Sequence, residues 1–264
     1  MDCKKLVKKM EKRLRKLNKV VANFSLRLLY RFKPLPAIRH GTAIVLFLLF
    51  TFHLSLFTPS AEARFLFFGR KKTTHEKKFD EKKKKLRSKK PLERGRSAED
   101  IIRFDREKGV DEVIRALNRE ENKEAKKQML NALGNSKNKK AIPEIKKFLN
   151  SEDEDIRLYS ACSLARLGDV SGIEELKKTA LNIKEKRGRR SMAIRALGNI
   201  KSDEAVAVLE QVLDDDDFAI RLQAVSSLGK IGTERAIQLV EGMLSDKNER
   251  VRKAAENALK RAGK

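Results

Sequence analysis

The most regular pattern of hydrophobic and polar positions lies between Asp214 and Asp246. Apolar residues recur every three to four positions in two runs, separated by a glycine-containing turn. This spacing predicts two amphipathic helices. Gly229 and Gly232 are expected to close the first, because glycine tolerates a left-handed backbone. Two such helices cannot bury their apolar faces alone and need similar neighbours. The predicted buried positions are Ile220, Ala224, Val225, Leu228 and Ile231, then Ala236, Ile237, Val240 and Leu244.

Equivalent positions recur along the second half of the chain. First-helix leucines are spaced 31, 33, 31 and 31 residues apart, and second-helix anchors follow in step at 31, 33 and 31. In four of five units an arginine stands seven residues before the leucine. Independent marks that share one period predict a repeat array. The leucines are Leu133, Leu164, Leu197, Leu228 and Leu259, the second anchors are Ile145, Leu176, Leu209 and Val240, and the arginines are Arg157, Arg190, Arg221 and Arg252.

The repeated motif is I/V-R-x-x-A-x-x-x-L-G followed by A-I/V-P-x-L, as in IRLQAVSSLGKIG, IRLYSACSLARLGD and AIPEIKKFL. It resembles HEAT repeats of the phycobilisome-lyase type over roughly residues 97–264. The resemblance implies an all-α fold, a right-handed α-solenoid of about five helix pairs whose second helices line the concave face. Three positions depart from the motif: Lys126, Ala165 and Arg189.

The expected domain is 97–264, with full repeats at about 122–152, 153–185, 186–217 and 218–247. Ser97 is expected to open the fold, with Asp100 completing a capping box. A divergent first pair and a last helix over 248–264 would shield the two ends of the array.

The N-terminal third differs sharply from the repeats. Residues 1–96 hold 28 basic and 7 acidic residues, so most of the formal net charge of +25 lies there. Residues 1–40 read as a basic amphipathic segment, either a helix on an anionic membrane surface or a short coiled coil. A simple basic lead to a targeting segment is also open.

Residues 41–63 contain an uncharged apolar run that ends in Ala61-Glu62-Ala63. They are expected to act as a cleaved signal peptide or an uncleaved signal anchor, placing the repeats on the extracytoplasmic side. The flanking basic residues do not favour one orientation. A cytoplasmic array and a buried core helix are the alternatives.

Residues 64–96 are expected to form an extended, Lys-rich linker, because like charges repel. Aromatic residues beside basic ones at its start suit contact with an anionic membrane surface: Phe65, Phe67, Phe68, Arg70, Lys71 and Lys72. A solvated spacer and a polyanion contact are the other interpretations. Nucleic acid is an unlikely partner, since no recognition motif accompanies the charge.

Two features of the array are candidates for binding another protein or peptide. The turn Asn182–Ser191 is longer than the others and basic, with Lys184, Lys186, Arg187 and Arg189. The second helices change sign, from a net +3 over 139–150, which include Lys146 and Lys147, to −7 over 203–217, which include Glu210. Such a gradient would orient a charged partner.

The repeats offer little for catalysis. All three histidines precede them, so no His-based metal site or nucleophile–His pair is expected within the array. We predict no catalytic, cofactor-binding or metal-ligating residue, no cofactor, and a structural role for the repeat arginines. Cys162 is expected to pack as a small apolar residue. The resemblance leaves a bilin-lyase-like enzyme or maturation factor as the alternative to a binding scaffold.

Overall fold

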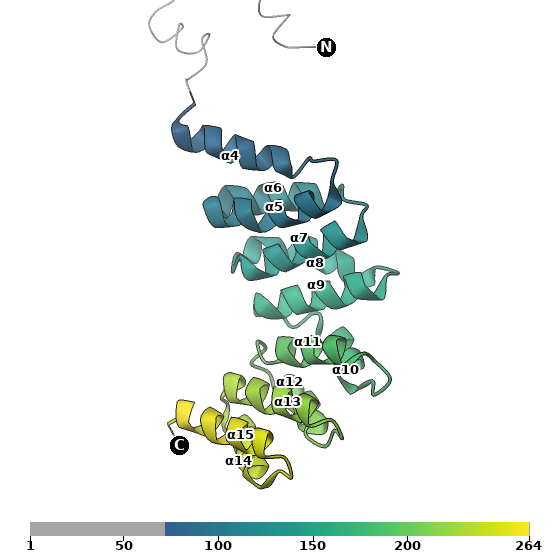
Figure 1. Cartoon of the computed structure of the whole chain (residues 1–264), viewed down its shortest axis with the longest axis vertical. Coiled ribbons are helices and arrows are strands. Elements are labelled where there is room, and N and C mark those ends of the chain that lie inside the picture. Colours follow the sequence, from purple (N-terminus) through teal and green to yellow (C-terminus); the bar gives the residue numbers. More distant parts are fainter. Residues whose placement is uncertain (1–71, 264) are drawn as a thin grey trace, which may run out of the picture. The chain divides into compact units, whose positions relative to one another are not determined.

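The computed structural model describes residues 72–263, and this part contains twelve α-helices, three short 3-10 helices and no strand (Figure 1). The predicted segments 1–40 and 41–63, and Phe65, Phe67, Phe68, Arg70 and Lys71, lie outside the described residues. No helix in the described part combines the length and apolarity needed to span a bilayer. The helices are α4 (Thr74–Lys85), α5 (Pro91–Phe104), α6 (Arg106–Leu117), α7 (Lys123–Asn135), α8 (Ile142–Lys146), α9 (Glu154–Arg166), α10 (Ile173–Leu181), α11 (Arg187–Leu197), α12 (Asp203–Val212), α13 (Phe218–Ile231), α14 (Glu234–Gly242) and α15 (Glu249–Arg261).

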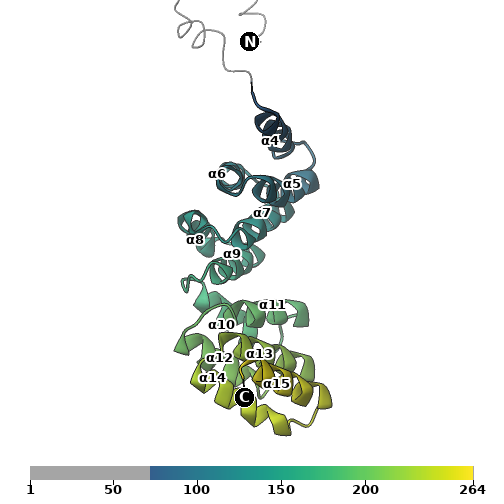
Figure 2. The same cartoon turned by 90° about the vertical axis from the view of Figure 1, so that its left-hand side faces the viewer.

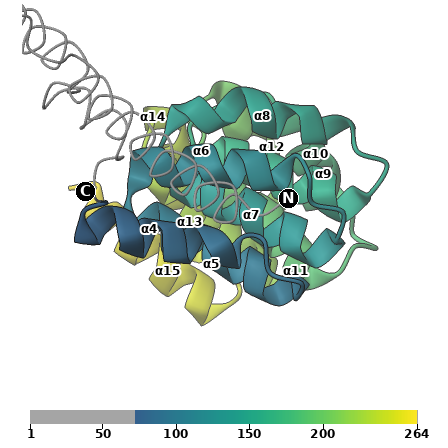
Figure 3. The same ribbon diagram turned by 90° about the horizontal axis from the view of Figure 1, so that it is seen from above.

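The helices form an α-solenoid of consecutive antiparallel pairs, as the period predicts. The first helices α5, α7, α9, α11, α13 and α15 stack on one another, and the second helices α6, α8, α10, α12 and α14 form a second row (Figures 1 and 2). Seen along the stack, the two rows form two layers (Figure 3). Three 3-10 turns extend the second helices: Lys139–Ala141 precedes α8 within its pair, whereas Lys147–Asn150 follows α8 and Met243–Ser245 follows α14.

The core lies between the two rows, where the repeat anchors meet. Leu133, Leu164, Leu197 and Leu228 are fully buried, as are all four second-helix anchors. Leu259 keeps 8% of its surface exposed, since no described helix packs beyond α15. The sequence-based core is therefore confirmed at the repeat anchors, and each such buried side chain contributes about 1.5–3 kcal/mol. The prediction is wrong for Leu244, which is 42% exposed because it lies in the 3-10 turn after α14 and not on the helix's buried face.

Short polar side chains begin the first helices. Asn122, Asp153, Asp217 and Asn248 each accept a backbone N–H from the first turn of the helix that follows. This satisfies amides that have no partner inside the helix. Helices α5 and α11 are the exceptions, since Lys90 and Lys186 precede them and make no side-chain cap.

The helical array begins earlier than Ser97, and the expectation of an extended linker over 64–96 is wrong for its described part. Thr73 and Glu76 form a capping box at the start of α4. Phe79 and Leu86 are buried against the following helices. Seven residues apart, they place a narrow apolar stripe on a highly charged helix. Lys72, predicted to face a membrane, forms an ion pair with Asp80.

Helices α5 and α6 form a full repeat. Ser97 lies inside α5, where its Oγ donates to the carbonyl of Arg94 at 2.9 Å, so the predicted capping box with Asp100 is wrong. Ile101 is fully buried 32 residues before Leu133, and Arg94 stands seven residues before Ile101. The sequence predicted this unit only as a divergent first pair, because an isoleucine stands in the leucine's place without a following glycine.

Gly229 and Gly232 have different roles. Gly232 ends α13 in a left-handed conformation, with φ 67°, as predicted. Gly229 lies within the helix, where an added Cβ would come 2.6 Å from the Cβ of Ala258 in α15. A glycine directly after the anchor leucine therefore lets the next first helix approach closely.

The same close approach recurs at Gly134 and Gly198, which face Ser163 and Ser227. These two serine hydroxyls donate to the carbonyls of Leu130 and Ile194 at 2.9 and 3.0 Å. Helix α9 carries Ala165 at the glycine's position.

Candidate partner-binding surface

The repeat arginines clamp the turns that precede their own helices. Arg157 Nη1 donates to the carbonyls of Ser151 and Glu152 at 2.8 and 3.0 Å. Arg221 does the same with Asp215 and Asp216, at 2.7 and 3.1 Å, and Arg252 with Asp246, at 2.8 Å. These contacts satisfy carbonyls that the turn leaves without helical partners.

Three arginines also reach forward to a carboxylate of the next turn. Arg221 donates to both oxygens of Asp246, at 2.8 and 2.9 Å, and Arg190 pairs with Asp215. The guanidinium of Arg221 holds the pKa of Asp246 below its usual range. Because the Arg221 and Asp246 side chains are only 4% and 5% exposed, the pair ties two repeats together and is not available to a partner.

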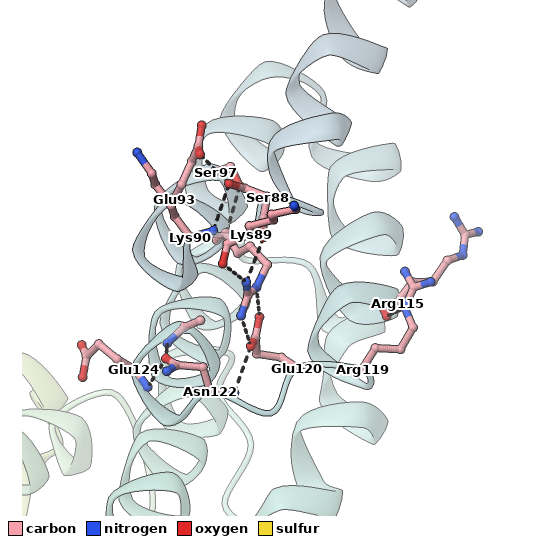
Figure 4. A network of polar contacts seen from close by, with 12 residues as sticks. Ser88, Lys89, Lys90, Glu93, Ser97, Arg115, Arg119, Glu120, Asn122 and Glu124 are labelled. Carbon is pink, nitrogen blue, oxygen red and sulfur yellow. Dashed lines mark hydrogen bonds and ion pairs between the residues drawn. The ribbon is translucent and has the colours of Figure 1, made fainter.

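Arg94 makes the same connection at the N-terminal end. It donates to Glu120 at 2.6 and 2.7 Å and to the carbonyl of Ser88 at 2.8 Å. Figure 4 shows Glu120 between Asn122 and the Ser88–Lys89 turn. The hydrogen bonds from Arg94 lower the pKa of Glu120. Sequence analysis missed this pair because Glu120 lies outside the recognised repeats.

The basic turn before α11 interrupts this series. Arg157 pairs with Glu175 of α10 at 3.2 Å, and Arg190 Nε donates to the carbonyl of Ala180 at 3.0 Å. Instead, arginines of the turn itself form ion pairs with carboxylates of the adjacent turns. Arg189 forms ion pairs with Asp155 and Glu185, and Arg187 pairs with Asp217 at 2.5 Å.

Lys184 and Lys186 stand apart from these ion pairs. Both are exposed and form no ion pair with any residue between 72 and 263. Ile183 beside them is 79% exposed. Of the predicted basic turn, only these two cations are thus free to meet a partner's charge.

Most predicted charges of the second-helix row bind one another. Lys146 pairs with Asp169 at 2.9 Å, Lys147 with Glu144 at 2.8 Å, and Lys140 with Asp111 at 2.6 Å. Burial alone would raise the pKa of Asp169, but hydrogen bonds from Ser171 and Lys146 outweigh it and lower the pKa. The basic end of the predicted gradient is therefore largely neutralised within the fold.

The acidic end is not. Glu210 pairs with Arg235 of α14 at 2.7 Å, but six other carboxylates of α12, α14 and the turn after α12 are exposed and form no ion pair with a described residue. We call these six the acidic surface: Asp203, Glu204, Asp214, Asp216, Glu234 and Glu241.

The described residues offer no cluster of three or more His, Cys, Asp or Glu side chains able to hold a metal ion. Cys162 is buried, as expected, and burial raises the pKa of its thiol to about 12. It therefore stays protonated at neutral pH and is a poor nucleophile.

Comparison with solved structures shows the same architecture. The phycocyanin lyase CpcE–CpcF complex from Nostoc sp. PCC7120 matches with a TM-score of 0.51 and 20% identity, covering 74% of this chain and 79% of that one. An engineered protein matches at 0.48 and 21% identity, over 70% and 96% of the two chains. A designed armadillo repeat protein in complex with a (KR)4 peptide matches at 0.47 and 18%, over 69% and 98%. At such identities the likeness concerns the fold alone.

No curated protein matches this chain significantly. The family model for HEAT repeats matches residues 110–191 and 173–260. These two stretches cover more than half of the chain, and they coincide with the helix pairs and anchors described above. The chain belongs to the HEAT-repeat family.

Proposed function

We propose that this protein is a scaffold that binds another protein or peptide through its row of second helices, and that a basic segment of the partner docks on the acidic surface. One observation carries the proposal. The lysines of α8 and its flanking turns are mostly neutralised by carboxylates of the array, whereas Asp203, Glu204 and Asp214 are exposed without a cation.

The charges left free decide what such a surface can bind. Six carboxylates on two adjacent helices and the turn between repeats that follows α12 produce a negative local potential on an otherwise basic chain. Such a potential steers a cationic partner and fixes its orientation. Since the carboxylates are exposed, each contributes little affinity by itself. We expect fast, salt-sensitive binding with several weak contacts.

The test uses the full chain and a fluorescent octalysine peptide. We expect the affinity for the peptide to fall as salt rises from about 50 to about 300 mM, because the Debye length shortens over this range and screens exposed charges. The triple variant Glu204→Gln, Asp214→Asn, Glu241→Gln should weaken binding and flatten its salt dependence.

A matched triple variant, Glu121→Gln, Glu152→Gln, Glu256→Gln, changes the net charge equally but leaves the acidic surface intact. It should bind the peptide like the original protein. Equal loss in both variants would show a general charge effect and would overturn the proposal, as would no loss in either.

We further propose that residues 41–63 target the array to or across a membrane, and that Phe65, Phe67, Phe68, Arg70 and Lys71 contact an anionic membrane surface. The uncharged run and Ala61-Glu62-Ala63 support this. Fractionation, combined with the N-terminal sequence of the mature protein, separates a cleaved signal from an anchor. Repeats protected from protease added outside intact cells would contradict export.

A further inference from the structure

One backbone position in the turns after α9, α13 and α15 favours glycine. Four residues after the anchor leucine, Gly168, Gly232 and Gly263 adopt left-handed conformations with φ 78°, 67° and 78°. Glycine adopts this conformation without steric strain. Lys137 holds the same position after Leu133 and keeps φ 55°. Lys201 stands four residues after Leu197 but does not adopt a positive φ. Lysine at Lys137 is a strained choice, and such strain persists where another requirement outweighs it.

These two lysines border one cleft. A hollow of about 400 Å³ lies where the turns after α7, α9 and α11 meet. Its lining includes five cations and no carboxylate: Lys137, Lys139, Arg166, Lys201 and Lys230. We call it the basic cleft. Its volume falls within the range of small-ligand sites, which is about 300–1,000 Å³.

The cations of the basic cleft are not neutralised by the fold. None forms an ion pair with a described residue, in contrast to Lys140, Lys146 and Lys147 on the second-helix row. Their contacts are with neutral groups. Arg166 Nη1 donates to Asn131 Oδ1 at 2.8 Å, and Lys230 Nζ donates to Asn199 Oδ1 at 2.6 Å.

Arg166 is less exposed than the four lysines of the basic cleft. Its side chain is half-buried, and burial, with the nearby charge of Arg195, lowers its pKa. A guanidinium remains charged under such conditions, since its unperturbed pKa is above about 12. Like charges held together and partly desolvated weaken the fold unless an anion joins them.

We propose that the basic cleft binds a compact anionic ligand that carries two or more phosphate groups. The planar fork of Arg166 suits a phosphate face, and the four lysines supply mobile point charges around it. The cations converge on one small cleft, whereas an extended acidic peptide would need a longer track. The site lies at the turns between first and second helices, so it is distinct from the acidic surface and independent of the proposed function.

The test is lysine footprinting of the full chain with acetic anhydride, read by mass spectrometry. Sodium tripolyphosphate is the soluble probe, and vesicles containing phosphatidylinositol bisphosphate present the same chemistry as a headgroup. We expect acetylation of Lys137, Lys139, Lys201 and Lys230 to fall together, while Lys178 on α10 keeps its rate. Site-specific rates matter because the N-terminal third also attracts anions.

Lys137→Gly is the decisive variant, because glycine fits the left-handed turn. It should leave the melting temperature unchanged or higher. The probe concentration that gives half-maximal protection of the remaining cleft lysines should nevertheless rise about tenfold, as expected for the loss of one charged contact. Arg166→Gln should raise this concentration likewise, and the surface control Lys178→Gln should not.

The two probes separate the source of the phosphate. Protection by tripolyphosphate indicates a soluble ligand, and protection by the vesicles alone indicates a headgroup; either supports the proposal. Cleft lysines protected no more than Lys178, protection that survives Lys137→Gly and Arg166→Gln, or protection by an octa-aspartate peptide alone would overturn it.

Discussion

Arg221 and Asp246, 25 residues apart in the chain, form a two-point ion pair that joins consecutive repeats, with N–O distances of 2.8 and 2.9 Å. Both side chains are almost fully buried. The same arginine also donates to the turn before α13. One side chain therefore fixes two inter-repeat turns, and its loss should destabilise the repeats of the C-terminal half.

Arg221→Ala should lower the free energy of unfolding by about 3–5 kcal/mol, because it leaves the carboxylate of Asp246 buried without its cation. Urea denaturation followed by circular dichroism measures this. Glu249→Gln removes the exposed pair with Lys253 and should leave the urea midpoint unchanged. Equal midpoints for Arg221→Ala and the original protein would refute the role assigned to this pair.

Acid should weaken the array through the same carboxylates. The pKa of Asp246 and of Glu120 is lowered in the fold by a hydrogen-bonded arginine. The unfolded chain therefore takes up protons first as pH falls, so the stabilisation is complete above the unfolded pKa values of about 3.9 for Asp and 4.3 for Glu. It is lost progressively as pH falls through the lower folded values.

Urea midpoints measured from pH 7 to pH 2.5 should stay level to about pH 5 and then decline. In Asp246→Asn the midpoint should be lower at pH 7, and its decline below pH 5 should be shallower, since one titrating group is gone. A variant that loses as much stability in acid as the original protein would exclude Asp246 as a source of the pH dependence.

Close approach of the first helices should make Gly229 sensitive to a single methyl group. Gly229→Ala places a Cβ 2.6 Å from that of Ala258, so α13 and α15 must shift. We expect a loss of about 1–3 kcal/mol, as for overpacked cores, despite the better helix propensity of alanine.

Gly188 provides the matched control. It is exposed in the first turn of α11, and a Cβ there would meet no atom within 4 Å. Gly188→Ala should be neutral or stabilising by up to about 1 kcal/mol. Thermal unfolding of the two variants tests this contrast, which fails if both alanines shift the melting temperature in the same direction.

The contrast also shows where sequence reasoning succeeds. Leu133, Leu164, Leu197 and Leu228 were predictable because periodic burial requires apolar residues at fixed intervals. Gly229 was misread, since its role depends on the distance to α15, which no local pattern encodes. Glu120 and Arg166 were missed for the same reason: their partners, Arg94 and Asn131, are 26 and 35 residues away.

The N-terminal boundary was misplaced for a different reason. Lysine dominates residues 77–90, and high charge is typical of linkers. Phe79 and Leu86 are the only buried residues of this stretch, and His75 and Lys83 add contacts with Phe104 and Glu112 of the array. One apolar stripe on an otherwise charged helix is enough for α4 to pack on the array, because only that side of the helix is buried among the described residues.

Phe79→Ala should therefore release α4 without unfolding the repeats. Phe79 supplies most of the helix's buried apolar surface together with Leu86, and the other residues of α4 are partly or fully exposed. Trypsin should cleave after Lys77, Lys78 and Lys82–Lys85 at least about tenfold faster, since loss of a buried aromatic costs about 3–5 kcal/mol and local opening governs cleavage. The exposed control Lys78→Ala should leave the other sites protected.

The urea midpoint of the remaining repeats should be nearly unchanged in both variants, because each repeat depends chiefly on its neighbours. Loss of the whole helical signal in Phe79→Ala would instead make α4 an integral part of the core.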